Sequence, residues 1–262
     1  MTSDALSDAY LGVTKSLNGR RWRLKDCDDR AALAMAQRLG VPDIVGRILA
    51  VRGVGLEEAS QFLDPTLRDL LPDPSSFLDM DTACARVAEA IKNNEKVAVF
   101  GDYDVDGATS SAVLIRFFRA IGADLTFYIP DRLKEGYGPN APALLKLKDS
   151  GVSVVITVDC GTGSFEPLEA AKKAGLDVIV LDHHKADARL PEAVAVVNPN
   201  RLDETGAHGQ LAAVGLVFCL WSALIVICGT LGSIRIRRSP ISSSGWISWR
   251  WALFVTSCRL WV

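Results

Sequence analysis

Acidic and lysine side chains are missing from the last part of this 262-residue sequence. No Asp, Glu or Lys occurs between Thr205 and Val262, where the charged side chains are five Arg. Residues 1–204 hold 24 basic and 31 acidic side chains, a net charge of −7, whereas the last stretch has +5. Five of the six Trp also lie at or after Trp221. Such an abrupt change in composition indicates that two unlike segments are joined.

Several motifs are also absent, and each absence excludes a class of protein. The six Cys form no C-x-x-C pair, which is typical of reduced thiols in a cytoplasmic protein. The acidic, polar N-terminus is not typical of a signal peptide. There is no G-x-x-x-x-G-K-[ST] loop for nucleoside triphosphates and no G-x-G-x-x-G for dinucleotides. Residues 1–204 show no basic groove, so charge alone does not indicate nucleic-acid binding.

The chain divides into three predicted parts. Residues 1–80 form a small helical lead-in, residues 81–220 form the main domain, and residues 221–262 are an aberrant tail that is not a native domain. In the main domain, helix-like segments alternate with short apolar runs, which predicts an α/β fold: a mostly parallel five-stranded sheet with helices on both faces. The predicted strands are 97–100, 125–129, 152–158, 178–181 and 194–197. In such sheets the active site lies beyond the carboxyl ends of the strands.

Three carboxylates follow the first predicted strand, in the segment Gly101–Gly107. Asp102, Asp104 and Asp106 lie so close in sequence that a divalent cation would relieve their repulsion. The pattern also resembles the start of an EF-hand, but the twelfth position of that loop is Val113 rather than Glu, and a strand precedes it. The remaining alternative is a solvated acidic turn.

A second acidic group follows the third predicted strand. Asp159 comes directly after an apolar run and precedes Gly161 and Gly163, whose small size lets backbone N–H groups approach an anion. Alone the signal is weak, because an Asp in this place is often only the N-cap of the next helix.

Two of the three histidines follow the fourth predicted strand, in Asp182-His183-His184. Imidazole is a metal ligand, and a neighbouring carboxylate can fix its tautomer. Two adjacent His beside an Asp, at the same predicted sheet edge as the other carboxylates, favour a site over a structural role. Together these groups suit a hydrolase in which two cations bind a phosphate and activate water.

In order and spacing these three segments resemble the first motifs of the DHH phosphoesterases. Further segments resemble the RecJ type of that superfamily, the single-strand-specific 5′→3′ DNA exonucleases of DNA repair and recombination. The resemblance covers about residues 20–220, and its additional segments are Phe62-Leu63-Asp64-Pro65, Leu78-Asp79-Met80, Ile129-Pro130-Asp131-Arg132, Gly136-Tyr137-Gly138-Pro139-Asn140 and Val197-Asn198-Pro199-Asn200.

The resemblance implies a role for each candidate residue. It implies two Mn²⁺ or Mg²⁺ ions held by Asp102, Asp104, Asp106, Asp159 and His183. His184 would contact the scissile phosphate, Asp182 would orient the histidines, and Asp159 would be part of the catalytic set. Substrate would be held by Arg132, Tyr137 and the loop Gly161-Thr162-Gly163. The implied partners are single-stranded DNA, a single-strand-binding protein and a helicase.

The tail departs from this family, whose fourth motif supplies a further metal-binding Asp. If the codons for residues 245–260 are read one base out of step, they can encode such a motif. We therefore interpret the tail as the product of a frameshift near residues 219–235 in a C-terminally truncated chain. We therefore expect weak activity. The apolar run 211–234 is long enough for a membrane helix, but we favour a buried helix over Leu211–Trp221.

Two alternative functions stay open at this point. One is another DHH phosphoesterase, acting on oligoribonucleotides, cyclic dinucleotides or pyrophosphate, although the long lead-in and Tyr103 argue against it. The other is a non-catalytic protein that binds a partner or a membrane through the same sheet domain.

Overall fold

The structure is a computed structural model that describes residues 9–230. It divides the chain into two compact units, Met1–Leu71 and Pro72–Val262. The predicted three-part division, with boundaries at residues 80 and 220, stays a prediction. The segment 245–260, which we interpret as a displaced fourth motif, lies outside the described residues, as does the end of the apolar run 211–234.

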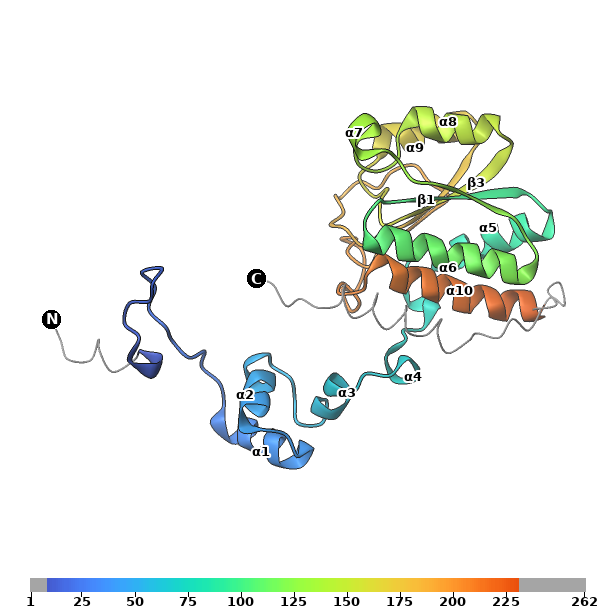
Figure 1. Cartoon of the computed structure of the whole chain (residues 1–262). Helices are drawn as coiled ribbons and strands as arrows, with labels where there is room; N and C mark the ends of the chain where they lie inside the picture. Colours follow the sequence, from blue (N-terminus) through green and yellow to red (C-terminus); the bar gives the residue numbers. More distant parts are fainter. Residues whose placement is uncertain (1–8, 231–262) are drawn as a thin grey trace. The chain divides into compact units, whose positions relative to one another are not determined.

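The first unit is helical, as the sequence predicts (Figure 1). Asp28 begins the first long helix by accepting hydrogen bonds from two backbone N–H groups of its first turn. A small apolar core holds the helices together, formed by Met35, Leu49, Val54 and Ala59. The elements of this unit are η2 (Tyr10–Gly12), α1 (Asp29–Leu39), α2 (Asp43–Val51), α3 (Ala59–Leu63) and α4 (Leu67–Leu70).

The second unit contains the predicted α/β domain. Its five strands form one sheet in the order β2-β1-β3-β4-β5, and every pair of neighbours is parallel, which confirms the predicted fold class. The strands are β1 (Lys96–Gly101), β2 (Leu125–Tyr128), β3 (Val152–Val158), β4 (Asp177–Leu181) and β5 (Ala195–Val197). The helices are η3 (Pro74–Ser76), α5 (Met80–Lys92), α6 (Val105–Ile121), α7 (Arg132–Glu135), α8 (Ala141–Asp149), α9 (Phe165–Lys173) and α10 (Ala213–Thr230).

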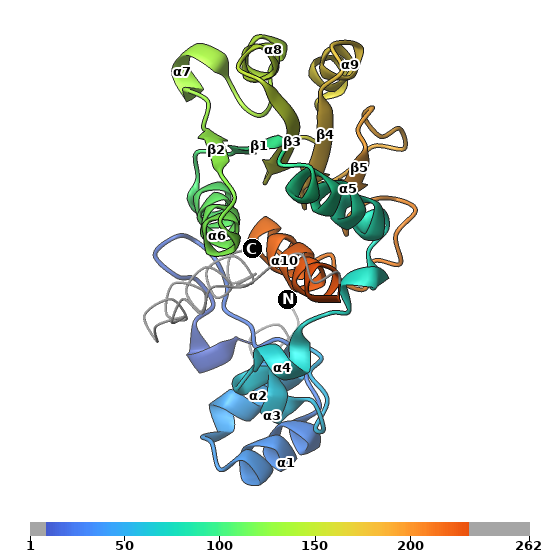
Figure 2. The ribbon, with the colours of Figure 1, turned by 90° about the vertical axis from the view of Figure 1, so that its right-hand side faces the viewer.

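Helices cover both faces of the sheet (Figure 2). Successive side chains of a strand point to opposite faces, so strands covered on both sides are apolar throughout. One face packs against α5, α6 and α10 through side chains that include Val99, Ile156 and Leu181. The other face packs against α8 and α9 through side chains that include Phe100 and Val180. The carboxyl edge of the sheet is left for the loops that carry the candidate site.

Helix α10 is a core helix of this unit. Leu216, Leu220 and Leu224 recur every fourth residue and are 0% exposed, and Trp221 packs partly buried against the same cluster. Val226 lies on the other side of the helix and is exposed. This agrees with the expectation of a buried helix over Leu211–Trp221, although the helix continues to Thr230. Within residues 9–230, no helix has the length and apolar character needed to cross a bilayer.

Candidate metal centre

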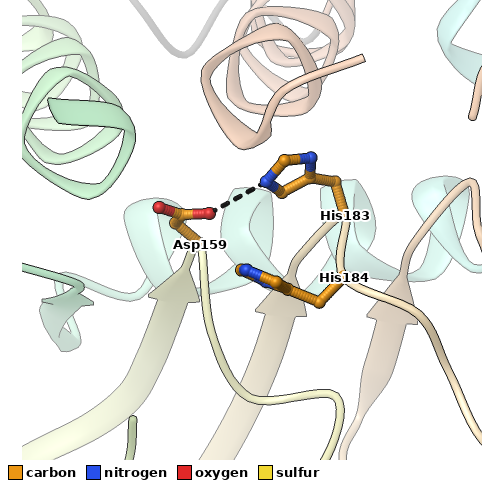
Figure 3. A group of neighbouring side chains, drawn as sticks. All are labelled: Asp159, His183 and His184. Carbon is orange, nitrogen blue, oxygen red and sulfur yellow. Dashed lines mark ion pairs between the residues drawn. The ribbon is translucent and has the colours of Figure 1, made fainter. Parts of the chain in front are cut away.

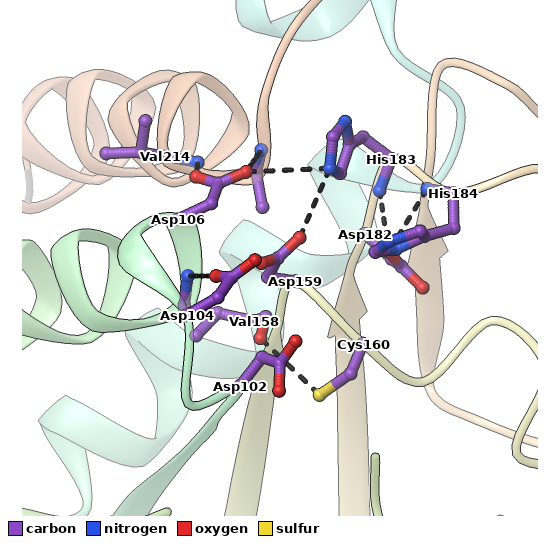
Figure 4. A network of polar contacts seen from close by, with 12 residues as sticks. Asp102, Asp104, Asp106, Val158, Asp159, Cys160, Asp182, His183, His184 and Val214 are labelled. Atoms are coloured by element: carbon purple, nitrogen blue, oxygen red, sulfur yellow. Dashed lines mark hydrogen bonds and ion pairs between the residues drawn. The ribbon is translucent and has the colours of Figure 1, made fainter. Parts of the chain in front are cut away.

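The side chains singled out in the sequence meet at the carboxyl edge of the sheet (Figure 4). β1, β3 and β4 are adjacent there, and each leads directly into a loop with Asp or His. After β1 the chain turns sharply into α6, where Asp104 is the N-cap and accepts a hydrogen bond of 3.0 Å from Gly107 N. Gly107 is required at this turn, because a Cβ would lie 2.4 Å from the Asp102 carbonyl oxygen.

Asp159, at the end of β3, is a buried carboxylate without satisfactory partners. It is 1% exposed, and its backbone has the left-handed φ of 62° that is uncommon outside glycine. Neither carboxylate oxygen has a hydrogen bond of good geometry, although His183 Nε2 lies 3.2 Å from Oδ1. Burial outweighs the contact with His183 and raises the pKa of Asp159 to about 7. A bound cation would satisfy such a group.

Asp159 is shared by two sets of potential metal ligands. The first set is Asp102, Asp104 and Asp159, and the second is Asp159, His183 and His184 (Figure 3); within each set the ligand atoms lie within 4.8 Å of one another. A carboxylate common to two sets could contact two neighbouring cations. Carboxylates suit Mg²⁺ and Mn²⁺, and imidazole suits transition metals. The residues therefore fit the Mn²⁺ or Mg²⁺ expected from the sequence.

Asp182, by contrast, is fully hydrogen-bonded. Its oxygens accept from Thr162 N at 3.0 Å, from the backbone N–H groups of His183 and His184, and from His184 Nδ1 at 2.7 Å. Burial alone would raise the pKa of Asp182, but the bonds from His184 and Thr162 outweigh it and lower the pKa to about 2. The same bond raises the pKa of His184 to about 9. Asp182 thus lies where it can orient His184, the role expected from the sequence.

Asp106 has a contact that sequence reasoning missed. Its two oxygens accept hydrogen bonds from the first turn of α10, from Ala213 N at 2.8 Å and Val214 N at 2.9 Å. Asp106 Oδ2 also lies 3.5 Å from His183 Nε2, but Asp106 is in neither ligand set. Its predicted role as a metal ligand stays a prediction, and the structure adds an anchoring role for α10.

Of the two predicted substrate-binding side chains, Tyr137 lies beside His184, and Arg132 is linked to Tyr137 through the Tyr103 ring. The Tyr137 hydroxyl donates to the Asp159 carbonyl oxygen at 3.1 Å and lies 3.4 Å from His184 Nδ1. Burial and nearby acids raise the pKa of Tyr137 well above its usual value, so the hydroxyl keeps its proton. The Arg132 guanidinium lies 5.0 Å from the centre of the Tyr103 ring, which in turn meets Tyr137 edge-on. Tyr103 was not predicted as a site residue.

The predicted loop Gly161-Thr162-Gly163 has a buried and an exposed part. Gly161 has φ 119°, and a Cβ there would lie 2.7 Å from Thr157 Oγ1, so only glycine fits. Thr162 is 2% exposed, donates its N–H to Asp182 and accepts from Asn198 Nδ2 at 2.9 Å. Gly163 is exposed. Substrate binding by this loop stays a prediction, and Thr162 has its polar groups directed into the protein.

Known proteins resemble this chain in sequence and fold. Residues 96–233 match the DHH family, N-terminal domain, which is more than half of the chain. The chain belongs to the DHH family. Among its DHH relatives, the single-stranded-DNA-specific exonuclease RecJ of Bacillus subtilis is 37% identical over 205 residues, which are 78% of this chain and 26% of that protein.

Solved structures of RecJ agree with both the fold and the metal. The structure of RecJ from Thermus thermophilus in complex with Mn²⁺ has a TM-score of 0.60 and 26% identity, and the match covers 79% of this chain and 28% of that one. A crystal structure of exonuclease RecJ bound to manganese has a TM-score of 0.51 and 32% identity, covering 58% and 39%. This DHH chain is thus homologous to RecJ, and it spans 26–39% of the length of these relatives.

Proposed function

We propose that this chain is a metal-dependent phosphodiesterase that degrades single-stranded DNA from its 5′ end. The observation that carries the proposal is the buried Asp159 carboxylate, which has no hydrogen bond of good geometry and is shared by two sets of ligand atoms. Homology to RecJ supports the choice of substrate, since the B. subtilis relative is an exonuclease specific for single-stranded DNA.

Each group at the sheet edge has a task in this proposal. Asp102, Asp104, Asp159 and His183 would hold Mn²⁺ or Mg²⁺, and Asp106 would contribute from its place beside His183. The ions, when bound, would polarise the phosphate and lower the pKa of a water molecule. The bond to Asp182 raises the pKa of His184 and so favours the protonated imidazole, which could donate to a phosphate oxygen whose negative charge grows during the reaction.

The substrate strand would lie against the group formed by the exposed Arg132 and Tyr137 and the half-buried Tyr103. An Arg guanidinium binds phosphate through a planar pair of donors, and Tyr rings stack on bases of any sequence. The Tyr137 hydroxyl is already engaged with the Asp159 backbone, so its ring is held next to the centre. This placement would bring the terminal phosphodiester towards His184 and the cations.

The proposal is tested with purified chain and a single-stranded oligonucleotide labelled at either end. We expect Mn²⁺-dependent release of short products from the 5′ end, loss of cleavage in EDTA, and little cleavage of a blunt duplex. Asp159→Asn serves as the inactive control. Rapid turnover of dinucleotides or pyrophosphate with none of the long strand would instead assign the chain to another kind of DHH phosphoesterase, and no hydrolysis of any of them would contradict the proposal.

We also propose that the activity is lower than that of the longer relatives. Residues 205–262 contain no Asp or Glu, so that stretch provides no further carboxylate for the cations. The further metal-binding Asp of the family's fourth motif is therefore missing from this stretch. Its loss would weaken a shared two-metal site, since each carboxylate offsets part of the charge of the ions. Rates measured beside those of a full-length RecJ under identical Mn²⁺ concentrations would test this, and equal rates would contradict it.

A further inference from the structure

Two asparagines in the segment that follows β5 contact the turn after β4, which contains His183 and His184. Resting on the proposed metal-dependent function, we propose that Asn198 and Asn200 are positioning residues. Their side-chain amides hold the backbone carbonyls of His184 and His183, and thereby fix where the two imidazoles point. Neither asparagine touches the potential ligand atoms themselves, so their effect passes through the turn.

Asn198 is the more deeply buried of the pair, at 0% exposed. Its Nδ2 donates to the His184 carbonyl oxygen at 2.9 Å and to Thr162 Oγ1 at 2.9 Å. Its Oδ1 accepts from Asn200 N at 2.8 Å. Both amide hydrogens and the amide oxygen are therefore used, which no smaller polar side chain could do. Through Thr162, whose N–H bonds to Asp182, Asn198 is also connected to the carboxylate that orients His184.

Asn200 holds the other histidine. Its Nδ2 donates to the His183 carbonyl oxygen at 2.5 Å and to the Gly209 carbonyl oxygen at 3.2 Å. Gly209 belongs to the loop before α10, and the first turn of α10 is bonded to Asp106. Asp106 lies 3.5 Å from the His183 ring. Asn200 therefore links the His183 backbone to the loop that contains Gly209. That loop leads into α10, whose first turn is bonded to Asp106, a neighbour of the His183 ring.

The positions of the two rings depend on these contacts to different degrees. The His184 ring has its own partner in Asp182, at 2.7 Å. The His183 ring makes polar contacts with Asp159 and Asp106, at 3.2 and 3.5 Å, and both of these carboxylates are expected to face a cation. Without metal, the His183 ring is therefore oriented by these two contacts together with the backbone that Asn200 holds. Partners behind the ligands commonly change metal affinity by about 10- to 100-fold.

The test compares Asn200→Ser and Asn198→Ser with Asn93→Ser. Asn93 is an exposed residue in the turn before β1, where its amide lies 3.4 Å from Glu95 Oε1, so it provides a control for the same chemical change. Manganese affinity is measured by electron paramagnetic resonance of free Mn²⁺. Imidazole ring signals are recorded by nuclear magnetic resonance on the metal-free full chain, with His183 and His184 assigned by single substitution.

We expect Asn200→Ser to weaken Mn²⁺ binding about tenfold or more and to move the His183 ring signals. We expect Asn198→Ser to move the His184 signals, and Asn93→Ser to change neither quantity. Should the deeply buried Asn198 variant fail to fold, the partly buried Asn200 decides. Unmoved ring signals, or an Mn²⁺ affinity for Asn200→Ser within about twofold of the control, overturn the proposal. If the unaltered chain binds no Mn²⁺, the proposed function fails, and the ring signals alone decide the positioning role.

Discussion

Replacing Asp159 by Asn is the most informative change at this centre, because it should stabilise the metal-free fold while removing its response to metal. The Asp159 side chain is 1% exposed and its oxygens lack good hydrogen bonds. The folded protein therefore holds a carboxylate that is poorly solvated whenever it is ionised. Asn keeps nearly the same shape and tolerates the left-handed backbone at this position well.

The size of the effect follows from the pKa. Raising the pKa of Asp159 from 3.8 to about 7 disfavours its ionised form in the fold by roughly 4 kcal/mol. Because the folded pKa is the higher one, this cost is absent below about pH 4, grows as the unfolded chain ionises, and is complete above about pH 7. Asn removes this cost but leaves a buried amide with unsatisfied groups, at about 2 kcal/mol. We expect a net gain of about 2 kcal/mol at pH 8.

Urea unfolding in EDTA at pH 8, and again with Mn²⁺, measures both parts of this prediction. Mn²⁺ at about 100 times its dissociation constant should stabilise the unaltered chain by about 2.7 kcal/mol, and most of this should be lost in Asp159→Asn. Asp182→Asn is the matched control at the same sheet edge. The pKa of Asp182 is lowered to about 2, so losing its charge should destabilise the fold by roughly 2 kcal/mol. If Asp159→Asn destabilised the metal-free protein as Asp182→Asn does, Asp159 would be an ordinary structural carboxylate.

Three further predictions concern stability and substrate. The bond to Asp182 raises the pKa of His184 to about 9, so its stabilising effect is complete below pH 6.5 and is lost as the pH rises through about 9. Urea unfolding in EDTA from about pH 6 to 10 should show a smaller decline in the free energy of unfolding for His184→Gln than for the unaltered chain. Equal declines would refute this. Leu216→Ala in α10 should cost about 2–5 kcal/mol, whereas Val226→Ala, at an exposed position of the same helix, should cost under about 0.5 kcal/mol; similar losses would show that α10 is not packed as described. Arg132→Ala should raise KM for single-stranded DNA several-fold and leave the Mn²⁺-induced shift in Tm unchanged. The reason is that Arg132 contacts the Tyr103 ring and belongs to neither ligand set. An altered Tm shift would place Arg132 in the metal centre.

The strands could be predicted from the sequence because a sheet covered on both faces requires uninterrupted apolar runs. The run Val152–Val158 is β3 to the residue. The ambiguous segment was the apolar run after residue 210. Hydropathy is similar for a membrane helix and for a helix buried in protein, so composition could not separate them. The burial of Leu216 and Leu220 against the sheet is what identifies α10 as a core helix.

The centre was predictable in its location but not in its contacts. Asp102, Asp159 and His183 could be placed together from the sequence because the carboxyl ends of parallel strands meet at one edge. Which way each side chain turns depends on residues far away in the sequence. Asp106 is bonded to the first turn of α10, more than a hundred residues later. Asn198 was noted only as part of a segment after β5, and its role beneath His184 follows from the folded loop.

Asp159 and Asp182 show why a sequence signature alone cannot assign roles at such a centre. Both follow an apolar strand directly, yet the pKa of Asp159 is raised and that of Asp182 is lowered. The difference lies in their partners. Asp182 accepts hydrogen bonds from the His184 ring and from the Thr162 N–H, whereas the left-handed turn at Asp159 leaves its oxygens without hydrogen bonds of good geometry. The oxygens of Asp182 are therefore satisfied within the protein, whereas those of Asp159 would be satisfied by the proposed cations. Substitutions at the two positions should consequently change stability in opposite directions, although both would impair the chemistry.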